Sequence, residues 1–326
     1  MKNLNWGIFS TGAIAKNFAK TADAMGISIY GIASRTLQSA NAFAAQFNIA
    51  HAYGSYEEMV QDPAIDVIYI ATPHNLHYEN MVLCLTHGKH VFCEKPITVT
   101  RAEAEKAYAL AAEKGLFLME AYWTRLIPLN EKLLQLLSQN VIGTVQLAQA
   151  NYGYISQGPR GVRKMDPALA GGALLDIGIY TIGYLAMLFG YAPKQITGSV
   201  TRCNVGTDAL STVVMEYENG IKAVALTAIG THIPVEAVIY GSEGRIVIPN
   251  HKNPTRIEVI LNDGTTTVYE DEFAVNGYEY EIEHAAQCIT DGKLTSDKYT
   301  PAMSLSMMDI FDKLRADWEM RFPFEQ

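Results

Sequence analysis

Residues 6–120 alternate short apolar runs with longer segments in which apolar residues recur every three or four positions. Short apolar runs bounded by turn residues are typical of buried strands, whereas the longer spacing is typical of helices that bury one face. The alternation indicates βαβ units and a doubly wound parallel sheet. The pattern predicts strands at Trp6–Ser10, Ile27–Ser34, Asp66–Ala71, His90–Cys93 and Phe117–Glu120, and helices at Ile14–Met25, Leu37–Phe47, His77–His87 and Arg101–Lys114.

The pattern changes after Tyr122, where the predicted strands become longer and alternate apolar with polar residues. Such alternation is typical of an antiparallel sheet with one solvated face. Turn sequences at 218–220 (Glu-Asn-Gly) and 262–264 (Asn-Asp-Gly) predict hairpins. The expected strands are Val145–Tyr154, Ile196–Cys203, Ser211–Tyr217, Ile221–Ile229, Val235–Tyr240 and Arg256–Leu261, and the expected helices are Leu174–Phe189, Tyr278–Thr290 and Ala302–Met320.

Charge and cysteine content indicate the cellular compartment and disfavour some classes of partner. The chain has 25 Lys and Arg against 34 Asp and Glu, a formal net charge of −9 that disfavours nucleic acid as a partner. The four cysteines lie far apart without a Cys-x-x-Cys pair, which argues against a disulfide framework and favours the reducing cytoplasm. The N-terminal segment is too polar for a signal-peptide core, and the charge-free run 177–192 is too short to span a membrane. We expect a cytoplasmic protein that binds neither nucleic acid nor membrane.

The turn between the first predicted strand and helix has the character of a phosphate-binding loop. It reads Gly-Ile-Phe-Ser-Thr-Gly-Ala-Ile-Ala over residues 7–15, with Ser10 at the first glycine position of the G-x-G-x-x-G/A motif and small residues at the other two. Small residues there let the backbone approach a pyrophosphate, which the helix N-terminus stabilises. Its place in the chain predicts cofactor contacts from Ser10, Thr11, Gly12, Ala13 and Ile14.

The end of the second predicted strand bears on which nicotinamide cofactor is bound. Ser34-Arg35-Thr36 lacks the acidic residue that NAD sites place against the ribose 2′-hydroxyl. Arg35 can pair with a 2′-phosphate, and the Ser34 and Thr36 hydroxyls can donate to it. NADP is therefore the favoured cofactor, with NAD still open; a solvated surface arginine is the alternative role for Arg35.

Together these patterns predict an α/β protein of two domains, in keeping with a length of 326 residues. Residues 1–122 would form a Rossmann dinucleotide-binding domain, and residues 123–326 an α+β domain with a large, mostly antiparallel open-faced sheet. The second domain would bind the substrate. A sheet with one exposed apolar face is a large patch for a monomer, so we expect a homodimer through it, or a tetramer if two such dimers pair.

Two further loops follow parallel strands, Ala-Thr-Pro-His-Asn-Leu-His at 71–77 and Cys-Glu-Lys-Pro at 93–96. With the loop at 10–13, they resemble the Gfo/Idh/MocA oxidoreductases over essentially the whole chain. No metal site is expected in this chain, because no third ligand is placed by spacing beside the two histidines of the first loop. The resemblance implies that Thr72, Pro73, Asn75 and His77 line the nicotinamide ribose, that Glu94-Lys95-Pro96 lies beside the nicotinamide, and that Lys95 reaches the substrate.

The segment Gly-Gly-Ala-Leu-Leu-Asp-Ile-Gly-Ile-Tyr at 171–180 carries the candidate substrate chemistry. Asp176 and Tyr180 are four residues apart and so share one helix face. Many sugar and inositol members of the family have histidine at the second position. Tyrosine there, with the segment 119–125, is similar to the branch containing trans-dihydrodiol dehydrogenase and NADP-dependent D-xylose dehydrogenase. That resemblance implies Lys95 and Tyr180 as the catalytic pair, Asp176 as a residue that orients substrate hydroxyls or holds Lys95, and Trp123 and Arg125 on the substrate side.

The predicted function is NAD(P)-dependent hydride transfer between nicotinamide and a secondary alcohol or hemiacetal carbon of a sugar, cyclic polyol or trans-diol. Tyr180 would accept the hydroxyl proton, because a nearby ammonium and the oxidised nicotinamide favour the phenolate. Two alternatives stay open: a non-catalytic NAD(P)-binding sensor or regulator of the same fold, and an NAD-dependent glycosidase.

Overall fold

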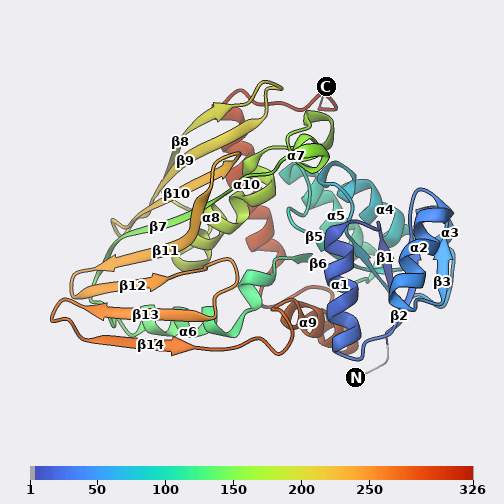
Figure 1. Ribbon diagram of the computed structural model, residues 1–326, viewed down its shortest axis with the longest axis horizontal. Coiled ribbons are helices and arrows are strands. Elements are labelled where there is room, and N and C mark those ends of the chain that lie inside the picture. The colour runs from blue at the N-terminus through green and yellow to red at the C-terminus, as the bar shows by residue number, and fades with distance from the viewer. Residues whose placement is uncertain (1–3, 326) are drawn as a thin grey trace. The chain divides into compact units, whose positions relative to one another are not determined.

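A computed structural model of the chain describes residues 4–325 and contains two sheets (Figure 1). The first has six strands in the order β3-β2-β1-β4-β5-β6, and each neighbouring pair is parallel. This is the doubly wound order of dinucleotide-binding domains, so the predicted Rossmann fold is confirmed. Its strands are β1 (Trp6–Phe9), β2 (Ile29–Ala33), β3 (His51–Tyr53), β4 (Val67–Ile70), β5 (His90–Glu94) and β6 (Leu118–Ala121), and its helices are α1 (Ala13–Ala24), α2 (Leu37–Phe47), α3 (Tyr56–Val60), α4 (His77–Thr86) and α5 (Arg101–Lys114).

The second sheet has eight strands in the order β14-β13-β12-β11-β7-β10-β9-β8. The pair β7 and β10 is parallel and the other neighbouring pairs are antiparallel, which confirms a mostly antiparallel sheet. Both predicted hairpins form, one joining β9 to β10 and the other β13 to β14. The strands are β7 (Val145–Tyr154), β8 (Gln195–Arg202), β9 (Asp208–Glu216), β10 (Lys222–Ile229), β11 (Ile233–Gly241), β12 (Gly244–Ile248), β13 (Arg256–Leu261) and β14 (Thr266–Glu270).

The helices outside the first βα series are α6 (Pro128–Ser138), α7 (Gly158–Lys164), α8 (Ala173–Phe189), α9 (Glu279–Thr290) and α10 (Pro301–Asp317). Helix α8 packs against β7, β9 and β10, and α6 packs against β13. Asp176 is the only charged residue of α8, and the helix is buried over most of its length. Within residues 4–325, no helix combines the length and the apolarity needed to cross a membrane.

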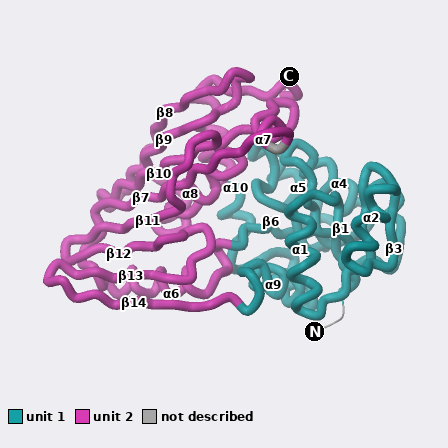
Figure 2. The backbone as a smooth tube through the Cα atoms, viewed as in Figure 1, with its two compact units in different colours: residues 1–123, 274–305 teal, residues 124–273, 306–326 magenta. Residues whose placement is uncertain are grey.

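The chain divides into two compact units, which Figure 2 colours separately. One unit comprises the chain up to Trp123 together with Ala274–Leu305, and the other comprises Thr124–Phe273 with the chain from Ser306 onward. The sequence interpretation assigned the segment 274–305 to the second domain. The segment joins the first unit because α9 packs against α1 and because the Leu118 amide donates to the Leu294 carbonyl at 3.1 Å. An apolar helix face does not reveal which sheet it will cover, so the sequence pattern could not place it.

Candidate active site

The loop between β1 and α1 has the backbone shape of an anion site. Ser10 adopts a left-handed φ of 85°, and its amide donates to the Ala33 carbonyl at 2.9 Å, which ties the loop to the end of β2. Gly12 is the N-cap of α1, and within the described chain no side chain caps this helix and no acid occupies its first turn. Amide groups in a first turn without a side-chain cap can receive an anion, and the helix dipole favours negative charge there. These residues therefore fit the diphosphate of a dinucleotide.

The end of β2 presents an arginine next to an aromatic pair. Arg35 is exposed. Burial raises the pKa of Tyr56, and the positive charge of Arg35 acts against that effect. Tyr56 stacks on Phe9 with ring centroids 4.4 Å apart. The Thr36 hydroxyl accepts from the Ser39 amide at 3.3 Å and so caps α2. Arg35 thus fits the predicted 2′-phosphate contact, while the Thr36 hydroxyl already has a structural partner.

His77 joins the loops that follow β4 and β5. Its ring is fully buried, with Nδ1 2.8 Å from the Pro96 carbonyl oxygen and Nε2 2.9 Å from the Thr72 carbonyl oxygen. The Thr72 hydroxyl accepts from the Asn80 amide nitrogen at 2.9 Å. Burial lowers the pKa of His77, and the two backbone contacts act against that effect. Since both ring nitrogens face backbone carbonyls, the structure gives His77 a bridging role, and its predicted ribose contact stays a prediction.

Buried carboxyl groups fix the backbone on both sides of Lys95. Glu94 Oε1 accepts from the Tyr69 hydroxyl at 2.5 Å, and Glu94 Oε2 accepts from the Lys95 amide at 3.2 Å. Glu120 Oε1 accepts from the Ile97 amide at 3.0 Å. Burial raises the pKa of Glu120 to about 7, and the charge of Lys95 is among the groups that lower it. With His77 on the Pro96 carbonyl, the backbone is therefore held at three successive residues, 95 to 97, as a side chain aimed at a reacting group requires.

The second unit holds the other predicted catalytic residues, on the first two turns of α8. Asp176 Oδ2 accepts from the Lys164 ammonium at 2.6 Å and from the Tyr154 hydroxyl at 2.5 Å, and Lys164 also contacts the Tyr154 hydroxyl. Tyr180 is 8% exposed and meets the Tyr152 ring edge-on, with centroids 6.2 Å apart. Asp176 is thus fixed and neutralised within its own unit, whereas Tyr180 lies against an aromatic neighbour.

Two glycines let this arrangement form at the start of α8. Gly172 has a φ of 131°, and a Cβ there would lie 2.1 Å from Asp208 Oδ1. Asp208 Oδ2 accepts from the Leu174 amide at 2.5 Å and so caps α8, although burial raises its pKa to about 7. A Cβ on Gly171 would lie 2.6 Å from the Lys164 carbonyl oxygen. These close approaches explain why Gly-Gly precedes the helix, since a Cβ on Gly171 would push away the end of α7 and a Cβ on Gly172 would push away Asp208.

Besides Lys164, which contacts Asp176, the second unit has a lysine near Tyr180. The Lys252 ammonium is 6.0 Å from the centroid of the Tyr180 ring and 5.6 Å from that of Tyr152. Its backbone is fixed by the Thr124 hydroxyl, which donates to the Lys252 carbonyl at 2.5 Å. The sequence interpretation missed Tyr152, Tyr154, Lys164 and Lys252, because they come from separate segments and no local motif connects them to α8.

The two remaining predicted substrate residues fall in different units. Trp123 is 5% exposed and stacks on Tyr278 at a centroid distance of 4.2 Å within the first unit. Arg125 pairs with Glu131 at 2.5 Å within the second. Both side chains have structural partners, so their predicted substrate contacts stay predictions.

The first unit has a doubly wound sheet whose first helix can receive an anion, and the second unit has an acid and a tyrosine on the helix that packs against its sheet. This combination is typical of a class of nicotinamide-dependent oxidoreductases. Residues 4–122 match the model of an oxidoreductase family with an NAD-binding Rossmann fold, and residues 130–247 match the Gfo/Idh/MocA C-terminal domain. The chain therefore belongs to the Gfo/Idh/MocA oxidoreductase family.

Individual relatives agree with this membership. The chain is 37% identical over 312 residues to trans-1,2-dihydrobenzene-1,2-diol dehydrogenase of Xenopus tropicalis, with 92% of each chain covered. Among solved structures, a 3-ketoreductase of Actinomadura kijaniata in complex with NADP and TDP-benzene matches with a TM-score of 0.89 at 23% identity, covering 97% of this chain and 98% of that one. An aldose-aldose oxidoreductase of Caulobacter crescentus matches with a TM-score of 0.85 at 21% identity, covering 98% and 99%. The two structures show that the fold is shared.

Proposed function

We propose that this chain is an NADP-dependent dehydrogenase that acts on a secondary alcohol or hemiacetal carbon of a trans-diol, cyclic polyol or sugar. The observation that carries the proposal is the tyrosine on α8 beside an aspartate already bound by a lysine. A tyrosine hydroxyl can exchange a proton with a substrate hydroxyl, whereas the ion-paired aspartate is suited to orientation. The diol dehydrogenase named above and the sugar oxidoreductase of the same fold support this substrate range.

The chemistry divides between cofactor and protein. Bound NADP supplies the hydride acceptor in oxidation and the hydride donor in reduction. Tyr180 accepts the substrate hydroxyl proton during oxidation and returns it during reduction. In this proposal Lys95 acts beside the nicotinamide, and the Lys252 ammonium, 6.0 Å from the centroid of the Tyr180 ring, favours the phenolate form of that tyrosine, since a positive charge nearby stabilises an anion. Asp176, which accepts from Lys164 and Tyr154, orients a neighbouring substrate hydroxyl or holds Lys95.

Cofactor selection belongs to the first unit in this proposal. The N-terminus of α1 holds the diphosphate, and Arg35 pairs with the adenosine 2′-phosphate. An exposed arginine at the end of β2, where no acid stands, supports NADP over NAD. A guanidinium can form two parallel hydrogen bonds to a phosphate, whereas a ribose hydroxyl offers it only one weaker partner.

Assembly and location are also proposed. On β9 and β10, alternate residues face away from α8, and Val214, Val224 and Leu226 of that face are only half-buried in the single chain. We propose that this face pairs two chains into a homodimer and that the protein works in the cytoplasm; the four free cysteines support the location. Light scattering of the wild type should give twice the mass of one chain, and Leu226→Arg should shift it to the monomer.

A panel of trans-diols, cyclic polyols and aldoses, assayed with NADP⁺ and NAD⁺ by the absorbance of the reduced nicotinamide, tests the proposed activity. The expected result is turnover of at least one class, faster with NADP⁺. Tight NADP⁺ binding without turnover on any compound would instead indicate a sensor. Cleavage of a nitrophenyl glycoside without net cofactor reduction would indicate a glycosidase.

A further inference from the structure

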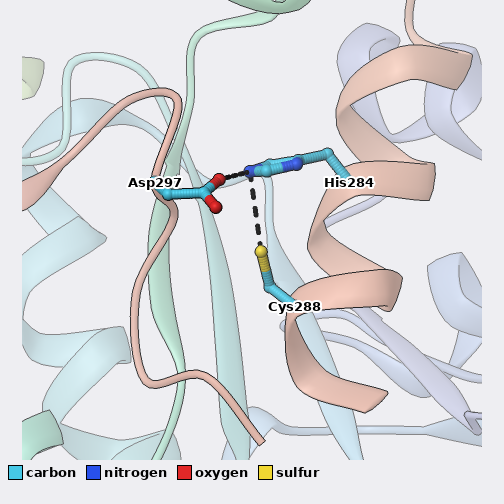
Figure 3. A group of neighbouring side chains, drawn as sticks. All are labelled: His284, Cys288 and Asp297. Carbon is cyan, nitrogen blue, oxygen red and sulfur yellow. Dashed lines mark hydrogen bonds and ion pairs between the residues drawn. The ribbon is translucent and has the colours of Figure 1, made fainter. Parts of the chain in front are cut away.

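Three side chains with metal-ligand chemistry converge at α9, outside the site described above (Figure 3). His284 and Cys288 lie one turn apart on the helix, and Asp297 lies on the loop between α9 and α10. His284 Nε2 is 3.5 Å from Cys288 Sγ and 3.7 Å from Asp297 Oδ1. The three ligand atoms all lie within 4.8 Å of one another. All three residues belong to the first unit, so the cluster forms within one compact body.

The two separations from His284 Nε2 are close to those around a tetrahedral zinc ion. Zinc lies about 2.3 Å from sulfur and about 2.0–2.2 Å from nitrogen or oxygen, so neighbouring ligand atoms stand roughly 3.3–3.6 Å apart. Hydrogen bonds already connect the cluster to its neighbours. His284 Nε2 is also 2.8 Å from the Ser296 hydroxyl, and a single ring nitrogen can make only one strong hydrogen bond. The lone pair on His284 Nε2 can either accept a hydrogen bond from the Ser296 hydroxyl or bind a metal ion.

The charges of the cluster suit a divalent cation. Asp297 Oδ2 pairs with the Lys293 ammonium at 2.7 Å while Oδ1 faces His284, and the hydrogen bond from Lys293 lowers the pKa of Asp297. Cys288 is 1% exposed, and burial raises the pKa of its thiol. A bound metal removes the proton from such a thiol, so one thiolate and one carboxylate would neutralise the ion. Asp297 is 61% exposed on its side chain, which leaves room for a water ligand.

We propose that His284, Cys288 and Asp297 bind a zinc ion with water as the fourth ligand, and that the metal fastens the loop after α9 onto that helix. Imidazole and thiolate favour zinc, whereas magnesium and calcium prefer oxygen ligands. When the metal binds, the Zn–S bond forms, the Cys288 S–H proton leaves to solvent, and no electron is transferred. The sequence predicts no metal site, because the cysteines form no Cys-x-x-Cys pair and no third ligand lies beside His74 and His77. Here the third ligand lies nine residues beyond the cysteine, a spacing that carries no signal.

Cobalt titration of the full-length, tag-free protein after chelator treatment tests the site, since cobalt reports thiolate ligands by a charge-transfer absorption band. The expected result is one cobalt per chain with such a band, its displacement by zinc, and release of one proton per zinc. Cys288→Ser should abolish the band, and His284→Gln and Asp297→Asn should each weaken zinc binding by about tenfold or more. Cys203→Ser is the matched control, because Cys203 lies outside the cluster, and it should keep both the band and the affinity.

Absence of the band in the folded wild type would overturn the proposal, as would a band that survives Cys288→Ser or disappears in Cys203→Ser. If Cys288→Ser does not fold, the wild-type stoichiometry and proton release still decide the question. Zinc should also raise the Tm of the wild type and leave that of Asp297→Asn nearly unchanged, because a ligand stabilises only the state that binds it. An equal shift in both proteins would show that zinc binds elsewhere.

Discussion

The predicted cofactor residues of the first unit and the predicted substrate residues of the second unit are held in place in different ways. In the first unit, the predicted cofactor residues lie on loops at the carboxyl ends of parallel strands, and backbone groups provide much of the binding chemistry. In the second unit, side chains from β7, α7, α8 and the segment after β12 meet around Asp176 and Tyr180. A backbone site tolerates changes of side chain outside its turn, whereas a side-chain cluster depends on each member. The largest single-residue effects on rate should therefore come from the second unit.

Tyr180→Phe should have the largest effect. Loss of the hydroxyl removes the proposed proton acceptor, and general acid–base catalysis contributes about 10²–10⁴-fold, so kcat should fall by that factor. The affinity for NADP⁺, measured by titration calorimetry, should stay unchanged because the cofactor residues lie in the first unit. Tyr184→Phe removes a hydroxyl one turn along the same helix, where it contacts Asn130 at 3.2 Å, and should keep most of the rate. Equal rates in wild type and Tyr180→Phe would remove Tyr180 from the mechanism.

Gly172→Ala should lower stability by more than the strain of its positive φ alone would. The new Cβ would lie 2.1 Å from Asp208 Oδ1 in addition to the strained φ of 131°, and we expect a loss of about 3 kcal/mol in the free energy of unfolding. Gly190→Ala is the control, since its φ of 108° is also positive but its Cβ would meet open space. It should cost about 1–2 kcal/mol. Urea denaturation measures both, and equal losses would show that the approach to Asp208 does not matter.

Arg35→Ala should raise the KM for NADPH much more than the KM for NADH. Loss of a charged hydrogen-bonding partner costs about 1.5–3 kcal/mol, so the KM for NADPH should rise about 10–100-fold while that for NADH changes little. Lys20→Ala, an exposed cation on α1, serves as the control for net charge. Parallel increases in KM for both cofactors would argue against a 2′-phosphate contact.

Glu120→Gln should act on the pH dependence of stability rather than on the rate. Because burial raises the pKa of Glu120 from 4.5 to about 7, the folded state holds a proton that the unfolded state releases. Stability therefore falls as pH rises through that interval, by about 3 kcal/mol at most for this group. In the variant, the free energy of unfolding should differ less between roughly pH 5 and pH 8. Some pH dependence should remain, because burial also raises the pKa of Asp208 to about 7. An unchanged difference would show that Glu120 is ionised in the folded protein.

The same contrast explains what could be predicted from the sequence. The six-stranded sheet and its loops follow from local patterns, so Ser10 and Arg35 are predicted from neighbouring residues, whereas Lys95 is predicted from the resemblance of its Glu-Lys-Pro segment to the family. Strand β3, only three residues long, and strand β14, largely exposed, lack the apolar run that identifies a strand. The partners of Asp176 could not be predicted, since Lys164 reaches it only through the close packing at Gly171 and Gly172. Chemistry that depends on tertiary contacts is invisible to local spacing.

The most direct test of the proposed hydride transfer uses NADPH carrying deuterium at C4 of the nicotinamide, with the ketone form of the best substrate from the panel. Mass spectrometry of the product is the readout. Hydride transfer predicts one deuterium on the new carbinol carbon, delivered from only one of the two C4 positions. An alcohol product without deuterium from both the 4R- and the 4S-labelled NADPH, or a ketone left unreduced while NADPH is tightly bound, would contradict a dehydrogenase.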